Sequence, residues 1–212
     1  MQCPCKYLKL AGVSTTYPRI DGRNARGERT RTALATALLA LLEEGYLRPT
    51  SAEVAERAGV SLRSVFQHFE DMESLYAAVA DAQMERLGRF ISQETAEGPL
   101  GSRVTAFVER RSQLLETVTP VRRAAILQEP FSEELARRLR SAHDMARDEI
   151  ERAFAPELAM APLEERSHAV WALDVATNWS AWDTSRRLNG LSIENSKRVM
   201  ERMIVALVKE TD

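Results

Sequence analysis

The segment from residue 50 to residue 69, TSAEVAERAGVSLRSVFQHF, constrains the fold more than any other part of the chain. Thr50 followed by Glu53 has the spacing of a capping box, which predicts the start of a helix. Gly59 then ends this short helix, because glycine adopts the left-handed conformation of a helix C-terminus without strain. Ser61 caps a second short helix. The sequence therefore predicts a helix-turn-helix unit.

The second of these helices has two different faces. On a helical wheel at about 100° per residue, Leu62, Val65 and Phe69 share the side that we expect to be buried. Arg63 and Gln67 fall together on the opposite side. In the major groove, arginine can hydrogen-bond the edge of guanine and glutamine can hydrogen-bond the edge of adenine. A short helix can enter this groove. A solvated helix face suits the same two residues, so both interpretations stay open from the wheel alone.

Helical periodicity extends along most of the chain, and the alternation typical of strands is nearly absent. We therefore expect an all-α protein. Residues 1–27 contain several prolines and glycines and little periodicity, which indicates a flexible arm. Residues 1–31 hold seven basic and two acidic residues, although the whole chain has a net charge of −2. Such asymmetry favours binding of a polyanion near this end of the chain. The alternative is a solvated tail.

Residues 29–84 resemble the DNA-binding domain of the TetR family of transcriptional repressors. The motifs that carry the resemblance are Gly45, the pair Thr50 and Ser51, AGVS at 58–61, Phe66-x-His68-Phe69, and Leu75. The resemblance implies an all-helical homodimer, in which N-terminal helices bind DNA and C-terminal helices carry a ligand pocket. It also implies that the last two helices pair with their copies to form the dimer interface. Two departures are Phe66, where the family usually has a phosphate-contacting tyrosine, and Met72, where it often has a lysine.

The resemblance divides the chain into three parts. We expect a flexible basic arm at 1–27, a helix-turn-helix three-helix DNA-binding domain at 28–87, and a helical effector-binding and dimerisation domain at 88–212. The predicted DNA-binding residues are Thr50, Ser51, Ser61, Arg63, Ser64, Phe66, Gln67 and His68.

Local signals also divide the C-terminal half into helices. A helix follows the break at 97–102, and Thr119 with Pro120 is expected to start a short one, because proline is tolerated in a first turn. Ser132 is expected to start a long helix that ends near residue 154. Pro156 and Pro162 bracket an expected linker, followed by one helix over 163–188. Ser192 caps the last helix, on whose apolar stripe Ile204 is expected to serve the dimer interface.

The expected helix 163–188 contains a face that mixes tryptophan with polar side chains. On a single wheel its members fall close together, and such a mixture of flat apolar and polar groups is typical of a ligand pocket. A core or dimer-interface role for the tryptophans is the alternative. His143 is either a further pocket residue or an exposed one. The predicted effector-binding residues are Trp171, Asp174, Val175, Asn178 and Trp182.

These features favour a sequence-specific transcriptional regulator, a repressor that a small-molecule effector releases from a palindromic double-stranded DNA operator. The alternative is an activator or co-regulator controlled by a protein partner. A helical enzyme is a third class, but there is no phosphate-binding glycine loop or nucleophile elbow. The three histidines lie far apart, so we expect no metal site and no cofactor.

Two further features concern the environment of the protein. No apolar run approaches the ~20 residues that a membrane span needs. The only cysteines are Cys3 and Cys5, whose spacing suits neither a disulfide loop nor a metal site. We therefore expect a cytoplasmic protein in a reducing compartment, without a membrane partner. The homodimer is what the resemblance implies.

Overall fold

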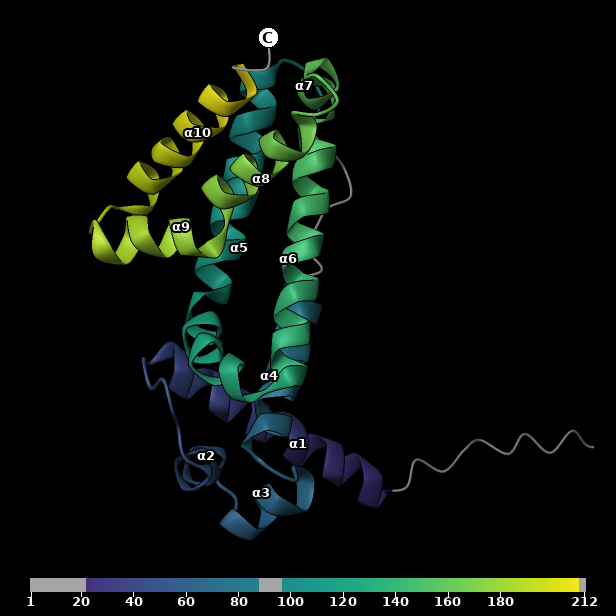
Figure 1. Cartoon of the computed structure of the whole chain (residues 1–212). Coiled ribbons are helices and arrows are strands. Elements are labelled where there is room, and N and C mark those ends of the chain that lie inside the picture. The colour runs from purple at the N-terminus through teal and green to yellow at the C-terminus, as the bar shows by residue number, and fades with distance from the viewer. Residues whose placement is uncertain (1–21, 88–96, 210–212) are drawn as a thin grey trace, which may run out of the picture.

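The computed structural model describes residues 22–87 and 97–209, and these residues form helices and connecting turns without a strand, as the sequence predicts. Figure 1 shows a tall molecule with α1 to α4 at one end. Two long helices, α5 and α6, run from these helices to the other end, where α7, α8, α9 and α10 gather. No helix within the described ranges has the length and apolar character needed to cross a membrane.

The four N-terminal helices follow the local signals of the sequence. Thr50 caps α2: its hydroxyl accepts from the Glu53 backbone, and the Glu53 carboxylate accepts from the Thr50 backbone. Gly59 ends α2 at φ 66°, in the left-handed region, and the Ser61 hydroxyl caps α3 by accepting from the backbone of Ser64. The capping box, the turn and the second cap are thus confirmed. The helices are α1 (Gly22–Glu43), α2 (Ser51–Ala58), α3 (Leu62–His68) and α4 (Met72–Leu87).

Two expectations for this end are wrong. Helix α1 begins at Gly22, so residues 22–27 are helical rather than part of a flexible arm. The arginines of this stretch are good helix formers, and a helix extends readily once it is nucleated. Leu62 is 46% exposed instead of buried. It lies in the first turn of α3, and no neighbouring helix covers the side on which the wheel places it. Residues 1–21 of the expected arm lie outside the described residues.

A compact apolar cluster holds the N-terminal helices together and reaches α5 (Leu100–Gln128). Ala124 of α5 belongs to this cluster and is fully buried. The long helix α5 is therefore packed directly onto the helix-turn-helix unit. Side chains that α1 to α4 contribute to the cluster include Leu34, Leu38, Val54, Val65, Phe69 and Leu75.

The C-terminal helices agree with the sequence at their caps. The Ser132 hydroxyl accepts from the backbone of Leu135 and starts a long helix that ends at Ala153. Gly190, at φ 64°, and the Ser192 hydroxyl, which accepts from the Asn195 backbone, precede the last helix. The elements after α5 are η1 (Glu129–Phe131), α6 (Glu133–Ala153), α7 (Ala155–Met160), α8 (Arg166–Thr177), α9 (Trp179–Asp183), η2 (Thr184–Leu188) and α10 (Ile193–Lys209).

Pro120 lies inside α5 and does not start a new helix, so that expectation is wrong. Proline in a helix interior removes a backbone bond and costs about 3 kcal/mol. Here the Thr119 hydroxyl donates to the Leu115 carbonyl at 2.6 Å, and Trp179 donates its indole N–H to Thr119. The turns of α5 on either side of Pro120 pack against the N-terminal cluster and against α9. These contacts keep α5 continuous.

The expected linker and the expected helix 163–188 are also different in the structure. Pro156 occupies the first turn of the short helix α7, where proline is tolerated. Asn178 breaks the long helix, since its ψ of 171° is extended and its side chain caps α9 by accepting from the backbone of Ala181. Residues on either side of Asn178 therefore do not share one helical wheel.

A second cluster forms the core of the C-terminal half. Trp182 and Ile204 are 2% and 0% exposed and lie in this cluster with Phe107 and Phe154, whose rings make an edge contact at 5.2 Å. Ile204 is thus a core residue of the single subunit. The expectation that Ile204 serves the dimer interface is wrong, because its face of α10 packs against α5 and α8 of the same chain.

Candidate nucleic-acid interface and interior cavity

Helix α3 presents Arg63 and Gln67 to solvent on the face opposite its buried residues. Val65 and Phe69 are each 2% exposed, whereas Arg63 and Gln67 are both exposed. Neither makes an ion pair or a side-chain hydrogen bond with any described residue. The exposed basic group is therefore unneutralised, which suits contact with a polyanion.

Helix α3 is held from behind by Arg31 of α1. The Arg31 guanidinium donates to the backbone carbonyl of His68 at 2.9 Å and lies 4.3 Å from the centre of the Phe69 ring. These contacts fasten the last turn of α3 to α1. Sequence analysis missed Arg31, and no local signal could have found it, because the partners are 37 residues apart.

The other predicted DNA-binding residues lie around the same turn. Thr50 and Ser61 use their hydroxyls in the two caps, so their side chains hold the helix starts. Phe66 is 55% exposed, which leaves its ring available at the surface rather than packed in the core. Ser51, Ser64 and His68 are half-buried. All eight predicted residues thus belong to the turn and the two helices that it joins.

A cavity of about 610 Å³ lies between α4, α5, α6 and the α8–α9 junction. Most of its lining surface is apolar, and Trp179 is the one tryptophan among its lining residues. Among the predicted effector-binding residues, Asp174 and Asn178 line this cavity, and so does His143. The volume falls within the range of about 300–1,000 Å³ that is usual for small-molecule sites.

Each carboxylate in the cavity wall has a cationic partner. Asp174 lies 2.9 Å from His143 Nε2 and 3.8 Å from Arg147. Glu149 lies 2.9 Å from the buried guanidinium of Arg111, and burial lowers the pKa of Arg111. These pairs compensate the cost of burying the carboxylates.

Three lining residues carry a polar atom without a protein partner. Within the described part of the chain, the Tyr76 hydroxyl, the Gln83 side-chain carbonyl oxygen and Arg111 Nε are buried and form no hydrogen bond. Tyr76 and Gln83 are 8% and 5% exposed, and burial raises the pKa of the Tyr76 hydroxyl. Buried polar atoms without a partner are rare in proteins, which marks this wall as chemically incomplete.

The predicted tryptophan face does not exist as one surface. Trp171 and Val175 are 53% and 65% exposed on the outside of α8, whereas Trp182 is buried and donates its indole N–H to Glu116. The break at Asn178 rotates α9 away from the wheel of α8. Sequence analysis also missed Trp179, which the same break turns toward the cavity.

Comparison with known proteins agrees with this geometry. Residues 33–79, which span α1 to α4, match the model of the bacterial regulatory proteins of the tetR family. Residues 33–79 thus form a tetR-family domain. An uncharacterised HTH-type transcriptional regulator of Mycobacterium tuberculosis is 34% identical over 74 residues, and a regulator of Mycobacterium bovis matches equally well. The match covers 35% of this chain and 38% of the length of these relatives.

Solved structures of TetR-like regulators share the fold over nearly the whole chain. A transcriptional regulator from Rhodococcus has a TM-score of 0.68 at 19% identity, covering 85% of this chain and 96% of the other. A tetR-family regulator from Streptomyces coelicolor has a TM-score of 0.65 at 20% identity, covering 87% and 88%. Identities this low establish the common fold of the C-terminal half.

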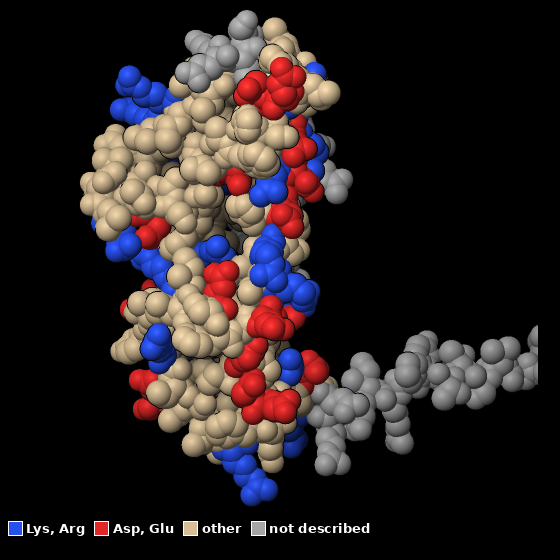
Figure 2. Space-filling view, viewed as in Figure 1, with Lys and Arg blue, Asp and Glu red and all other residues tan. Residues whose placement is uncertain are grey.

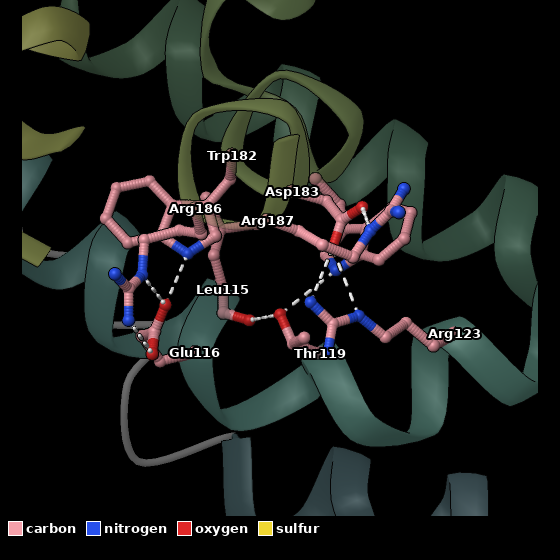
Figure 3. A network of polar contacts seen from close by, with 9 residues as sticks. Leu115, Glu116, Thr119, Arg123, Trp182, Asp183, Arg186 and Arg187 are labelled. Carbon is pink, nitrogen blue, oxygen red and sulfur yellow. Dashed lines mark hydrogen bonds and ion pairs between the residues drawn. The ribbon is translucent and has the colours of Figure 1, made fainter. Parts of the chain in front are cut away.

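A polar network joins α5 to α9 and η2 beside Pro120 (Figure 3). Glu116 accepts from Trp182 at 2.7 Å and from Arg186 at 2.9 Å. Two turns further along α5, Arg123 donates to Asp183 at 2.7 Å, and Arg187 also donates to Asp183. Burial alone would raise the pKa of Asp183, but the hydrogen bonds from the two arginines hold it below its ordinary value. The network fastens the cavity wall to the helix that packs on the DNA-binding end.

Proposed function

We propose that this protein is a sequence-specific transcriptional repressor that binds a palindromic operator as a homodimer and is released by a small-molecule effector. The observation that carries the proposal is the outward face of α3, where Arg63 and Gln67 are exposed and without a partner in the described chain. Arginine and glutamine have the donor and acceptor geometry that reads guanine and adenine edges. The family membership of the N-terminal domain supports the same role.

An apolar outer face of α8 and α10 supports the dimer. Trp171 and Val175 of α8 and Ile193 and Val199 of α10 are exposed in the single subunit, at 53%, 65%, 40% and 38%. Figure 2 shows a broad area with few charged side chains where α8, α9 and α10 lie. Large exposed apolar areas usually mark interfaces, and a second copy of this face would bury them. We name these four residues the α8–α10 face.

The cavity supports effector binding, because its wall includes α4 of the DNA-binding end as well as α5, α6 and α8. A ligand that contacts α4 can change the position of α3 relative to the partner subunit. For release, the ligand must bind the arrangement that does not fit the operator more tightly than the one that does. The network beside Pro120 would transmit such a change along α5.

Selection of bound DNA from a random pool tests the proposal. We expect the full-length protein to select a palindrome whose half-sites are about one helical turn or more apart. Affinity for that palindrome should fall steeply with salt, because basic side chains displace counterions from phosphates. Recovery of unrelated sequences without a shared motif would contradict sequence-specific regulation. A single unpaired half-site would contradict the dimer.

A further inference from the structure

The cavity wall contains a cation that no carboxylate contacts directly, although the charge of Glu129 acts on it from beyond ion-pair distance. Arg122 of α5 lines the cavity, is only partly exposed, and forms no ion pair or hydrogen bond with any described residue. Its guanidinium lies 6.0 Å from the centre of the Trp179 ring. Burial lowers the pKa of Arg122, because water is removed from the cation, and the charge of Glu129 offsets this only in part. Arginine nevertheless keeps its charge at neutral pH.

The charge balance of the cavity favours an anion over a cation. Four arginines and two carboxylates line it. Both carboxylates already have partners in the chain: Asp174 contacts His143 and lies near Arg147, and Glu149 pairs with Arg111. A cationic ligand would have to displace His143 or Arg111 to reach them. An anionic ligand would meet Arg122 without breaking any ion pair of the described chain.

The remaining wall defines the rest of the ligand. Leu114, Val118 and Leu139 are among the aliphatic residues that line the cavity, so the body of the ligand is apolar. The buried Tyr76 hydroxyl has no acceptor among the described residues and can donate to an oxygen of the ligand. The buried Gln83 oxygen lacks a donor, and a carboxylate does not supply one. An organic acid supplies acceptor oxygens and an apolar body together.

We infer that the effector is an organic acid, a carboxylate on an apolar body, whose anionic group binds Arg122 in the cavity between α4, α5, α6 and α8. This inference rests on the proposed effector role of the cavity and specifies the chemical class that it accepts. A carboxylate can take two parallel hydrogen bonds from a guanidinium, which makes the recognition directional. The contact of the ligand with α4, through Tyr76, then links acid binding to the DNA-binding end.

The test compares three ligands that share one chain and differ in charge. The neutral fluorophore N-phenyl-1-naphthylamine reports occupation of the apolar cavity in the full-length protein. Decanoate, decan-1-ol and decylamine then compete for the site at neutral pH. We expect decanoate to displace the fluorophore at about a tenfold lower concentration than the alcohol, with the amine weakest, because one charge-assisted hydrogen bond contributes about a factor of ten or more.

Variants assign the preference to one side chain. In Arg122→Gln we expect the advantage of decanoate over decan-1-ol to vanish while the alcohol binds as before. Arg122→Lys keeps the positive charge but lacks the planar guanidinium that donates two parallel hydrogen bonds, so it should retain part of the advantage of decanoate over decan-1-ol. Arg140→Gln is the matched control, since Arg140 is an exposed arginine of α6 outside the cavity lining, and it should keep the full preference. The comparison of decanoate with decan-1-ol uses the unmodified protein, so it does not depend on whether a variant folds.

The inference is overturned if the acid binds no better than the alcohol, if the amine binds best, or if Arg122→Gln keeps the acid preference. Failure of the fluorophore to bind also overturns it, because the apolar body would then have no site. DNA binding is measured separately with the selected palindrome. If the protein binds the operator but shows no preference for the acid, only this inference is wrong. If it prefers the acid but selects no operator, the proposed function is wrong and the acid-binding site remains supported.

Discussion

The two ends of the molecule use polar side chains in opposite ways. At the DNA-binding end, Arg63 and Gln67 point into solvent and have no partner in the described chain. In the C-terminal half, Asp174 and Asp183 are buried, and each lies within ion-pair distance of at least one arginine. The first arrangement leaves binding capacity for a large external polyanion. The second uses most of that capacity internally, so the proposed ligand preference of the cavity depends on the few groups without an ion pair, above all Arg122.

The ends also differ in how they are built. Local caps and one glycine define α2 and α3, whereas contacts between residues about 60 or more positions apart define the α5–α9 network. Changes at one end should therefore act on DNA recognition, and changes at the other on folding, assembly and ligand response. The following predictions test this division, beginning with the largest expected effect.

Ile204→Glu should unfold the subunit rather than merely separate a dimer. Ile204 is fully buried in the C-terminal core, and an unpaired carboxylate there costs on the order of 4 kcal/mol or more. Far-UV circular dichroism and urea unfolding measure the loss. Asn195→Glu, at an exposed position in the first turn of α10, is the control and should remain folded. A folded monomeric Ile204→Glu variant would return this residue to the interface.

Val175→Glu should produce a folded monomer. Val175 is 65% exposed and lies on the α8–α10 face, where a new charge would be buried against the second copy at a cost of several kcal/mol. Light scattering should give the mass of a single chain, and binding to the palindrome should weaken. Phe131→Glu is the matched control, because Phe131 is an exposed apolar residue of η1 outside this face. If Val175→Glu stays dimeric, the interface lies elsewhere.

Asp183→Asn should lower stability in a pH-dependent way. The lowered pKa of Asp183 means that its ion pairs stabilise the fold above the pKa of the unfolded chain, near 4, and that this contribution disappears as pH falls through the folded value. We expect a loss of about 1–3 kcal/mol at pH 7, as for hydrogen bonds to charged groups. Urea unfolding between pH 7 and pH 3 should show the difference shrinking toward acid.

The control for this prediction is Asp148→Asn, because Asp148 is exposed on α6 and makes no ion pair with the described residues. It should match the unmodified protein at every pH. A constant difference between Asp183→Asn and the unmodified protein across the pH range would show that packing, not charge, stabilises this position.

Arg63→Ala should weaken operator binding by about 1–3 kcal/mol and relax the sequence preference at one position of each half-site, with little effect on folding. Repeated selection from the random pool measures both effects. Arg57→Ala is the control, since Arg57 is a surface arginine of the same domain that is occupied by its ion pair with Glu44. An unchanged selected sequence in Arg63→Ala would assign base reading to other residues.

The basic segment that precedes α1 requires a truncation that respects the helix. Removal of residues 1–21 leaves α1 complete, whereas removal of 1–27 would delete its first six residues. We keep the expectation that the truncated protein binds all DNA sequences less tightly and with a weaker salt dependence, as expected when phosphate contacts are lost. An unchanged salt dependence would remove these residues from the DNA interface.

The sequence by itself determined the parts whose causes are local. The capping box at Thr50, the left-handed Gly59, the cap at Ser61 and the cap at Ser132 each depend on residues within four positions, and all are present in the structure. The outward direction of Arg63 follows from the periodicity of one short helix. These features follow from backbone hydrogen bonding and helix geometry, which neighbouring residues settle.

Only the tertiary structure decided the features that depend on distant partners. Pro120 looked like a helix start, but packing of α5 on two bodies holds it in a helix interior. Asn178 looked like one member of a wheel, but its side chain caps a new helix and turns Trp179 inward and Trp171 outward. A helical wheel gives the direction in which each side chain points from its own helix. It does not show which neighbouring helix lies in that direction. Whether a carboxylate such as Asp174 is free or paired depends on that neighbour, and so does the ligand that the cavity can accept.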